Sequence, residues 1–302
     1  MPAIALVTHP EYSFPFPGHH RFPMEKFGLL VEYLTHQGLM TPSNTHRPGK
    51  IRDDVLALAH SAEYISGFKN NQWPKALQRR MGLPWSPALA KRSFISPNGT
   101  LLTASLALTQ GIACHLAGGT HHAHYDFASG FCIFNDLAVT ALALLAMQKI
   151  KRVLIFDVDV HQGDGTARIL ANEPNAITVS VHCEKNFPVR KALSDWDIGL
   201  DKGMADDEYL AITTHSFAQA IDRYKPDLVL YDAGVAVDQH DPLGLLNITE
   251  SAIYSRDQNI LQQCKSQGIP VATVIGGGYD DDRKALARRH ALVVEAAFEV
   301  FN

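Results

Sequence analysis

Short apolar runs alternate along this chain with longer segments in which apolar residues recur at helical spacing. The strand-like runs span 3–8, 153–156, 176–182, 227–231 and 270–275. Helical spacing covers 24–36, 53–60, 62–68, 100–117, 137–150, 166–171, 206–224, 249–267 and 283–301. Most of the strand-like runs are continuously apolar instead of alternating with polar residues. The pattern therefore predicts an α/β fold with a central, mostly parallel sheet covered by helices on both faces.

Two segments fit neither period. Residues 70–99 contain four prolines and little periodicity, which predicts a functional loop or lid. Residues 120–135 (THHAHYDFASGFCIFN) are too polar and irregular for a regular element. The chain has no evident linker, internal repeat or low-complexity tract, so we expect one domain over residues 1–302.

Composition narrows the function classes. A formal net charge of -4 gives no general attraction to nucleic acid or to an anionic membrane, so neither is expected as a direct partner. No uncharged apolar run is long enough to span a bilayer, and the start MPAIALVTHPEYSF lacks the features of a signal peptide. The four scattered cysteines, without a CxxC pair, favour a reducing, cytoplasmic setting over disulfides or a thiolate zinc site.

Polar residues cluster where the predicted strands end. The 153–156 run leads into Asp157, Asp159 and His161 at every second position, and these would point to one side of an extended chain. Two carboxylates and an imidazole, with Asp159, His161 and Asp241 as ligands, match a catalytic zinc site with one open position. The alternative is a turn in which the acids cap helix amides.

Three further features suggest catalysis at the same sheet edge. His121 and His122 could act as base and acid beside a metal, with Asp157 and Asp164 as their partners, although adjacent histidines also occur in surface loops. Tyr279 follows three glycines and could donate to an oxyanion; a phosphate-binding loop would need a following Lys or Ser/Thr, which is missing. Phe131 and Phe187 could be core residues or could wall a narrow channel.

These motifs together resemble the zinc-dependent histone deacetylase superfamily, in the family's order and over nearly the whole chain. The segments that carry the resemblance are GGTHHAHYDFASGFCIFND, VLIFDVDVHQGDGT, DPLG at 241–244 and GGGY at 276–279. The stretches GLPWSP, NFPVRKALSDWDIGL and ALARRHALVVEAA look most like class IV deacetylases and their bacterial relatives.

The resemblance implies an arginase/deacetylase-like fold around one catalytic Zn²⁺ that removes an acyl group from lysine in a protein or peptide, or from a small amine. The residues that it implies fall into four groups: zinc ligands Asp159, His161 and Asp241; catalytic residues His121, His122, Tyr279, Asp157 and Asp164; a substrate channel of Gly130, Phe131 and Phe187; and a structural K⁺ site of Asp157, Asp159, His161 and Ser180.

One position departs from the family pattern, because Ala236 stands where the family usually has the Asp of Gly-x-Asp. This departure weakens the expected support of the 235–241 loop, and it favours an alternative in which the protein binds acylated ligands with little turnover. An acetylpolyamine amidohydrolase and a two-manganese, arginase-type hydrolase are further alternatives. The basic residues Arg79, Arg80, Lys91 and Arg92 could steer an acidic partner or could form a solvated face.

Overall fold

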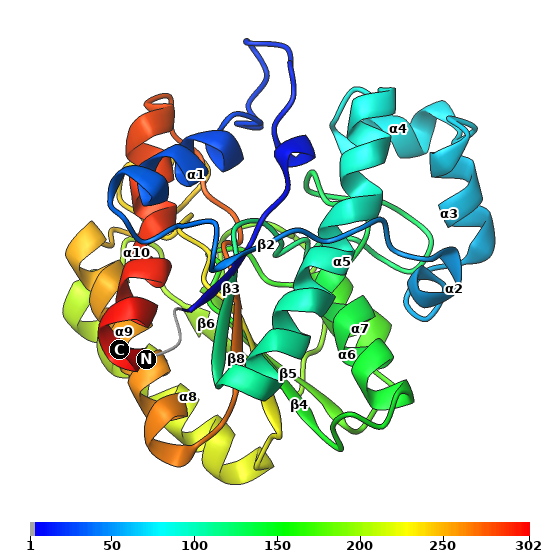
Figure 1. Ribbon diagram of the computed structural model, residues 1–302. Coiled ribbons are helices and arrows are strands. Elements are labelled where there is room, and N and C mark those ends of the chain that lie inside the picture. The colour runs from blue at the N-terminus through cyan, green and yellow to red at the C-terminus, as the bar shows by residue number, and fades with distance from the viewer. Residues whose placement is uncertain (1–3) are drawn as a thin grey trace.

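The computed structural model describes residues 4–302 and is built on one eight-stranded sheet (Figure 1). The strand order is β2-β1-β3-β8-β7-β4-β5-β6, and every neighbouring pair is parallel. The strands are β1 (Ala5–Val7), β2 (Thr45–His46), β3 (Ile112–His115), β4 (Val153–Asp157), β5 (Ala176–Cys183), β6 (Trp196–Leu200), β7 (Leu228–Asp232) and β8 (Val271–Val274). The predicted α/β class is confirmed, and the sheet is wholly parallel.

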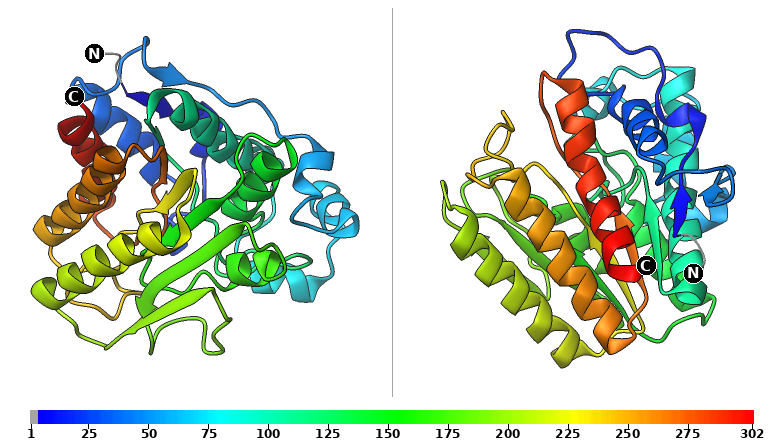
Figure 2. Two further views of the ribbon diagram at one scale, coloured as in Figure 1. Left: turned by 90° about the horizontal axis from the view of Figure 1, so that it is seen from below. Right: turned by 60° about the vertical axis from the view of Figure 1, so that its left-hand side comes forward.

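Helices cover both faces of the sheet (Figure 2). One layer contains α1 (Lys26–His36), α10 (Arg283–Phe301), α9 (Glu250–Gln267) and α8 (Asp206–Tyr224), each packed against the next. The other contains α5 (Pro87–Gln110), α6 (Asp136–Ala146) and α7 (Asp164–Leu170). Three short helices lie beside α5 in Figure 1: α2 (Asp53–Leu56), α3 (Ala62–Lys69) and α4 (Lys75–Met81). A 3₁₀ turn, Pro10–Tyr12, follows β1.

The 70–99 segment is not the loop that its composition predicted. It holds α4 and the first half of α5, which begins at Pro87 after a cap in which the Ser86 hydroxyl accepts the amide of Leu89. Proline is tolerated in the first turn of a helix, where its missing N–H has no partner to lose. Pro97 lies inside the helix, so the prolines that suggested a loop mark a helix start and a tolerated interior position instead.

The predicted helix 100–117 is also wrong in its second half. Helix α5 ends at Gln110, where Gly111 has φ +86°, and the chain then enters β3. Glycine adopts this backbone conformation without a steric penalty. The four residues of β3 are buried, and their apolar run continues that of the helix, so periodicity alone could not separate the two.

The parallel arrangement brings the carboxyl ends of the strands to one edge. Asp157, the last residue of β4, is in register with Ser180 of β5 on one side and with Asp232 of β7 on the other. Ligands of parallel sheets bind at this edge. None of the helices within residues 4–302 combines the length and hydrophobicity that a bilayer crossing needs.

Candidate active site

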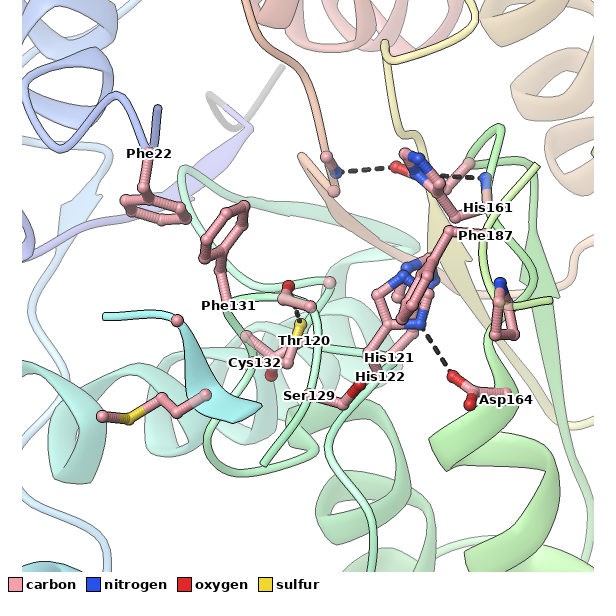
Figure 3. A pocket seen from close by; sticks show the side chains of 18 of the residues that line it. Phe22, Thr120, His121, His122, Ser129, Phe131, Cys132, His161, Asp164 and Phe187 are labelled. Carbon is pink, nitrogen blue, oxygen red and sulfur yellow. Dashed lines mark hydrogen bonds and ion pairs between the residues drawn. The ribbon is translucent and has the colours of Figure 1, made fainter. Parts of the chain in front are cut away.

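A pocket of about 740 Å³ opens beyond the carboxyl ends of the strands. It is lined by residues from segments far apart in the chain, including His121, His122, Asp159, His161 and Tyr279. In Figure 3, Phe131 and Phe22 lie on one side of the pocket, and Phe187 lies beside the imidazoles of His122 and His161 on the other. Most of the predicted site residues therefore meet in one cavity.

The start of α6 holds the two adjacent histidines in place. The Asp136 carboxylate accepts hydrogen bonds from the amides of Gly119 and Thr120, at 3.1 and 2.7 Å. The side chain of Asn135, which caps α6, donates to the carbonyls of His121 and Ala123. These bonds satisfy a buried irregular backbone that has no strand or helix partner. The His121–His122 segment is thus fixed from both sides.

Each of the two imidazoles donates its Nδ1–H to a separate carboxylate. His121 Nδ1 lies 2.7 Å from Asp157 Oδ2, and His122 Nδ1 lies 2.8 Å from Asp164 Oδ1. A carboxylate can only accept, so both rings carry the Nδ1 proton and leave Nε2 for other chemistry. The partnership that the sequence suggested between these four residues is present in the structure.

The two imidazoles have opposite proton affinities. Burial lowers the pKa of His121, but the charge and hydrogen bond of Asp157, followed by Asp159 and Asp232, outweigh it and raise the pKa to about 10. Burial and then the charge of His121 lower the pKa of His122 to about 3. Near neutral pH the pair therefore holds one proton-loaded and one neutral ring, an arrangement typical of acid and base partners.

The alternating side chains after β4 do not follow an extended chain. The strand ends at Asp157, whose Oδ1 accepts the amide of Asp159 at 3.0 Å. Asp159 Oδ1 in turn accepts the amide of His161 at 2.9 Å, and lies 2.9 Å from its Nδ1. Consecutive Asx-type turns, not strand pleating, bring these side chains together.

Two of the predicted ligands, Asp159 and Asp241, share a support. The amide of Gly277 donates to Asp159 Oδ2 at 2.8 Å, and the amide of Tyr279 donates to Asp241 Oδ2 at 2.7 Å. Burial, partly offset by backbone hydrogen bonds, raises the pKa of Asp241 to about 7. The raised pKa shows that the buried negative charge of Asp241 is poorly compensated within the protein. Two buried carboxylates and an imidazole are a ligand set that fits a divalent cation, whose charge would provide this compensation.

The most compact cluster of potential metal ligands is a different one. Within residues 4–302, the group whose ligand atoms all lie within 4.8 Å of one another is His121, Asp157 and Asp232; Asp159, His161 and Asp241 are more widely spaced. Both carboxylate oxygens of Asp232 are buried without a hydrogen-bond partner, and Oδ2 lies 3.8 Å from His121 Nδ1. Burial, followed by the charge of Asp157, raises the pKa of Asp232 well above its ordinary value.

The aromatic residues predicted to form a channel line the pocket. Phe187 is 40% exposed and stands edge-on to His122, with 4.8 Å between ring centroids. Phe131 lies 6.0 Å from Tyr279 and 5.8 Å from Phe22. Gly130, with φ +53°, passes so close to His122 that a Cβ there would run into the imidazole. Burial raises the pKa of Tyr279 well above its ordinary value, so the phenol keeps its proton.

Three residues of the site were assigned no role from the sequence. Asp232 ends a predicted strand, the position that drew attention to Asp157, but had no partner in a motif. His124 donates from Nε2 to Asp164 Oδ2 at 3.1 Å. Lys26 is buried in the pocket wall, with Nζ 3.4 Å from the carbonyl of Gly278 and near the rings of Phe22, Phe27 and Tyr279.

Ala236 does not leave the 235–241 loop without support. Asp238 Oδ1 accepts the amide of His240 at 2.9 Å, and Asp238 Oδ2 lies 3.1 Å from Nε of the buried Arg289. Arg289 also pairs with Glu250 and Asp280. The loop that carries Asp241 is therefore anchored to α9 and α10 through this arginine.

Residues 20–297 match the family described as the histone deacetylase domain. The chain belongs to the histone deacetylase family. It is 44% identical over 296 residues to an uncharacterised protein of Picosynechococcus sp., with 98% of this chain and 99% of that protein covered. It is 28% identical to the acetoin utilization protein AcuC of Staphylococcus aureus and 26% identical to histone deacetylase 2 of Arabidopsis thaliana. These alignments cover 88% and 91% of this chain, and 74% of each relative.

Solved structures of histone deacetylase homologues share the fold. A homologue crystallised with SAHA superposes with a TM-score of 0.80 at 22% identity, covering 99% of this chain and 88% of that one. The HDA15 HD domain gives a TM-score of 0.78 at 20% identity, covering 98% and 90%. The expected family and its fold are confirmed; the class IV subgroup stays a prediction.

Proposed function

We propose that this histone deacetylase family member is a zinc-dependent amidohydrolase that removes an acetyl or other acyl group from lysine or a lysine-like amine. The observation that carries the proposal is the pair of adjacent buried imidazoles, each hydrogen-bonded to its own carboxylate. They face the same pocket as Asp159, His161 and Tyr279. Residues 1–302 would form its single catalytic domain.

Asp159, His161 and Asp241 would hold the zinc. When bound there, zinc would polarise the amide carbonyl and make water more acidic. The proposed structural K⁺ would lie at Asp157, Asp159, His161 and Ser180, and the register of β4 with β5 places Asp157 beside Ser180. Four buried free thiols support the cytoplasmic location that we also propose.

The chain's own residues divide the remaining work. Neutral His122 would accept a proton from the attacking water through Nε2, while the proton on His121 is available to the departing amine. Tyr279, protonated, would donate to the oxygen that becomes negative in the tetrahedral state. Gly130, Phe131 and Phe187 would hold the acyl-lysine stem in a narrow apolar passage. The names of the relatives and the SAHA-bound homologue support an acylated amine as the substrate class.

A fluorogenic acetyl-lysine peptide tests the proposal. Protein loaded with zinc is expected to release the fluorophore, and a chelator should abolish release until zinc is restored. A protein that binds the peptide but releases nothing would instead be a recognition module. A screen of acyl chain lengths and acylated polyamines then separates lysine substrates from small amines.

A two-metal hydrolase is a second candidate, favoured specifically by Asp232. Its carboxylate adds to His121 and Asp157 the third ligand that another cation would need. Elemental analysis of manganese-loaded and zinc-loaded protein decides between the candidates. One ion per chain, unchanged in Asp232→Asn, supports the single-zinc enzyme. Two ions, falling to one in that variant, support the alternative.

A further inference from the structure

We propose that four exposed arginines around the pocket, Arg21, Arg80, Arg168 and Arg190, bind acidic residues of the peptide that carries the acylated lysine. We call these residues the arginine rim. The inference rests on the proposed function and names the substrate class of the same site. It extends recognition from the acyl-lysine side chain to the residues on either side of it.

The arginine rim is assembled by the fold. Arg21 precedes α1, Arg80 lies in the last turn of α4, Arg168 lies in α7, and Arg190 follows β5 in the loop that leads to β6. All four are exposed and all four line the catalytic pocket. Four separate segments thus present the same charged group to one opening. Of the basic residues that the sequence suggested as a steering group, only Arg80 is among these four.

No exposed acid among the residues that line the pocket balances this charge. The acidic lining residues are Asp159 and Asp164, and both are buried and bound to histidines. The chain as a whole carries an excess of acidic residues, with a formal net charge of -4. A local concentration of positive charge on an acidic protein attracts an acidic partner to that place on general electrostatic grounds.

The rim arginines are also uncommitted inside the protein. Across residues 4–302, none of the four side chains makes an ion pair or a hydrogen bond, whereas Arg52, Arg283 and Arg289 each pair with an acid. Arg80 is held differently, because its guanidinium lies 3.7 Å from the centroid of the Phe127 ring. This cation–π contact positions the guanidinium and leaves its hydrogen-bond donors for a ligand.

The surface beside the rim suits a chain rather than a small molecule. The loop that carries Arg190 also exposes Val189 and Leu193, at 95% and 89% of their surface, next to Phe187 at the pocket. Isolated exposed apolar residues are ordinary, but here two lie on the loop that borders the pocket. A peptide with acidic and apolar residues around its acyl-lysine fits both features.

Matched peptides test the proposal on the zinc-loaded protein. Two peptides of equal length carry one acetyl-lysine, flanked by Glu in one and by Gln in the other. Exposed pairs are each worth roughly twofold to fivefold, so several together should make kcat/KM at least about tenfold higher for the acidic peptide at low ionic strength. The preference should shrink towards unity at about 0.5 M salt, since exposed charges are screened there.

Neutral substitutions locate the effect. Arg21→Gln, Arg168→Gln and Arg190→Gln should each reduce the preference for the acidic peptide and leave turnover of the neutral peptide unchanged. Arg80→Gln should also reduce the preference, which is taken there as the ratio of the two turnover rates because the Arg80 guanidinium packs on Phe127 beside His124. Arg79→Gln is the matched control, because Arg79 is an exposed neighbour on α4 that does not line the pocket. Arg223→Gln on α8 is a distant control. A preference that persists in the combined rim variant, or that falls equally in the controls, would overturn the proposal.

Binding measurements keep the inference separate from the proposed function. Fluorescence anisotropy with labelled versions of the same peptides reports on the rim even when no acyl group is released. If no acyl group is released but the acidic peptide still binds in an arginine-dependent way, the hydrolase proposal is wrong and the arginine rim proposal stands. Equal binding of both peptides defeats the rim and leaves the hydrolase. A small acetylated amine bearing one carboxylate that competes as well as the acidic peptide overturns the assignment to a peptide.

Discussion

His124 donates a hydrogen bond to the oxygen of Asp164 that His122 does not use, with 3.1 Å between Nε2 and Oδ2. His122, the proposed general base, therefore shares its carboxylate with a second imidazole. His124 is itself stacked on Phe127 at 4.0 Å between ring centroids, and the Arg80 guanidinium also packs on the Phe127 ring. A continuous set of contacts thus joins the arginine rim to the partner of His122.

Replacing His124 with Phe should weaken this support and lower stability. Burial raises the pKa of Asp164, but its hydrogen bonds to His122 and His124 have the larger combined effect and lower the pKa well below its ordinary value. Losing one bond to a buried charge costs about 1–3 kcal/mol. A carboxyl whose pKa is lower in the folded state than in the unfolded state stabilises the fold at pH values above the unfolded-state pKa. This stabilisation is lost as the pH falls towards the folded-state pKa. The variant should therefore unfold at a higher pH on acidification.

Urea unfolding at pH 7 and pH 4 measures the His124 effect. His124→Gln keeps an N–H donor and should recover part of the loss, while His215→Phe on the exposed side of α8 is the control. Equal unfolding curves for wild type and His124→Phe at both pH values would refute the role of this bond.

Tyr279→Phe should fold and bind zinc like the wild type but hydrolyse acetyl-lysine poorly. The ring lines the pocket, and its packing against Phe131 does not involve the hydroxyl. Removal of one donor to a developing oxyanion typically lowers kcat by about a hundredfold or more. Turnover, zinc content and thermal unfolding are measured together. Unchanged turnover would contradict the assignment of the phenol.

Gly130→Ala should lower activity by more than its effect on stability explains. The position has φ +53°, and the new methyl group would displace the His122 imidazole. Gly203 has φ +80°, but no atom lies within 4 Å of the place that a Cβ would occupy, so Gly203→Ala introduces the backbone strain alone. Gly203→Ala should lose roughly 1 kcal/mol of stability from the backbone strain, and Gly130→Ala should lose more because its methyl group also displaces the His122 ring. Only Gly130→Ala should lose more than about tenfold in kcat, and equal kcat values would contradict the steric argument.

Lys26→Met should stabilise the fold near neutral pH. Burial, followed by the charge of Arg92, outweighs the opposing charges of Asp159, Asp241 and Asp232 and lowers the pKa of Lys26 to about 7. The unfolded lysine binds its proton up to about pH 10.4. Between these values the unfolded state holds more protons, so wild-type stability rises with pH.

The methionine variant has no such titration and should be more stable at pH 7, with the difference shrinking towards pH 10. Chemical unfolding at pH 7, 8.5 and 10 measures this, with the exposed Lys151→Met as control. Parallel pH profiles for wild type and Lys26→Met would show that the buried ammonium is better solvated than its surroundings suggest.

The sequence specified the fold class and most helices because apolar spacing records which face is buried. Helices α8 and α10 were bounded correctly at both ends, since each has sustained periodicity and a clear acidic start. The first turn of α8 contains Asp206 and Asp207, and Asp282 caps α10. β6 was missed because its residues are only partly buried, and β2 because it has two residues. Helix α5 was misjudged where Pro97 and Gly99 lie inside it.

Some residues of the candidate site could likewise be predicted from the sequence, and others could not. His121, His122, Asp157 and Asp164 could be grouped in advance because they lie in short motifs with distinctive spacing. Lys26, His124 and Asp232 could not, since their importance comes from contacts made across the fold. Lys26 on α1 reaches the carbonyl of Gly278, His124 stacks on Phe127, and Asp232 is in register with Asp157. Isolated residues of these types occur throughout the sequence without any such role.

The segment after β8 offers the amides of Gly277 and Tyr279 to Asp159 and Asp241, two residues apart on one stretch of backbone. A shift of this stretch would therefore move both acidic groups and the phenol as one piece. The proposed cation site and the position of Tyr279 are therefore mechanically coupled. A substitution that moves only the acidic groups or only the phenol would have to lie outside the segment 276–279.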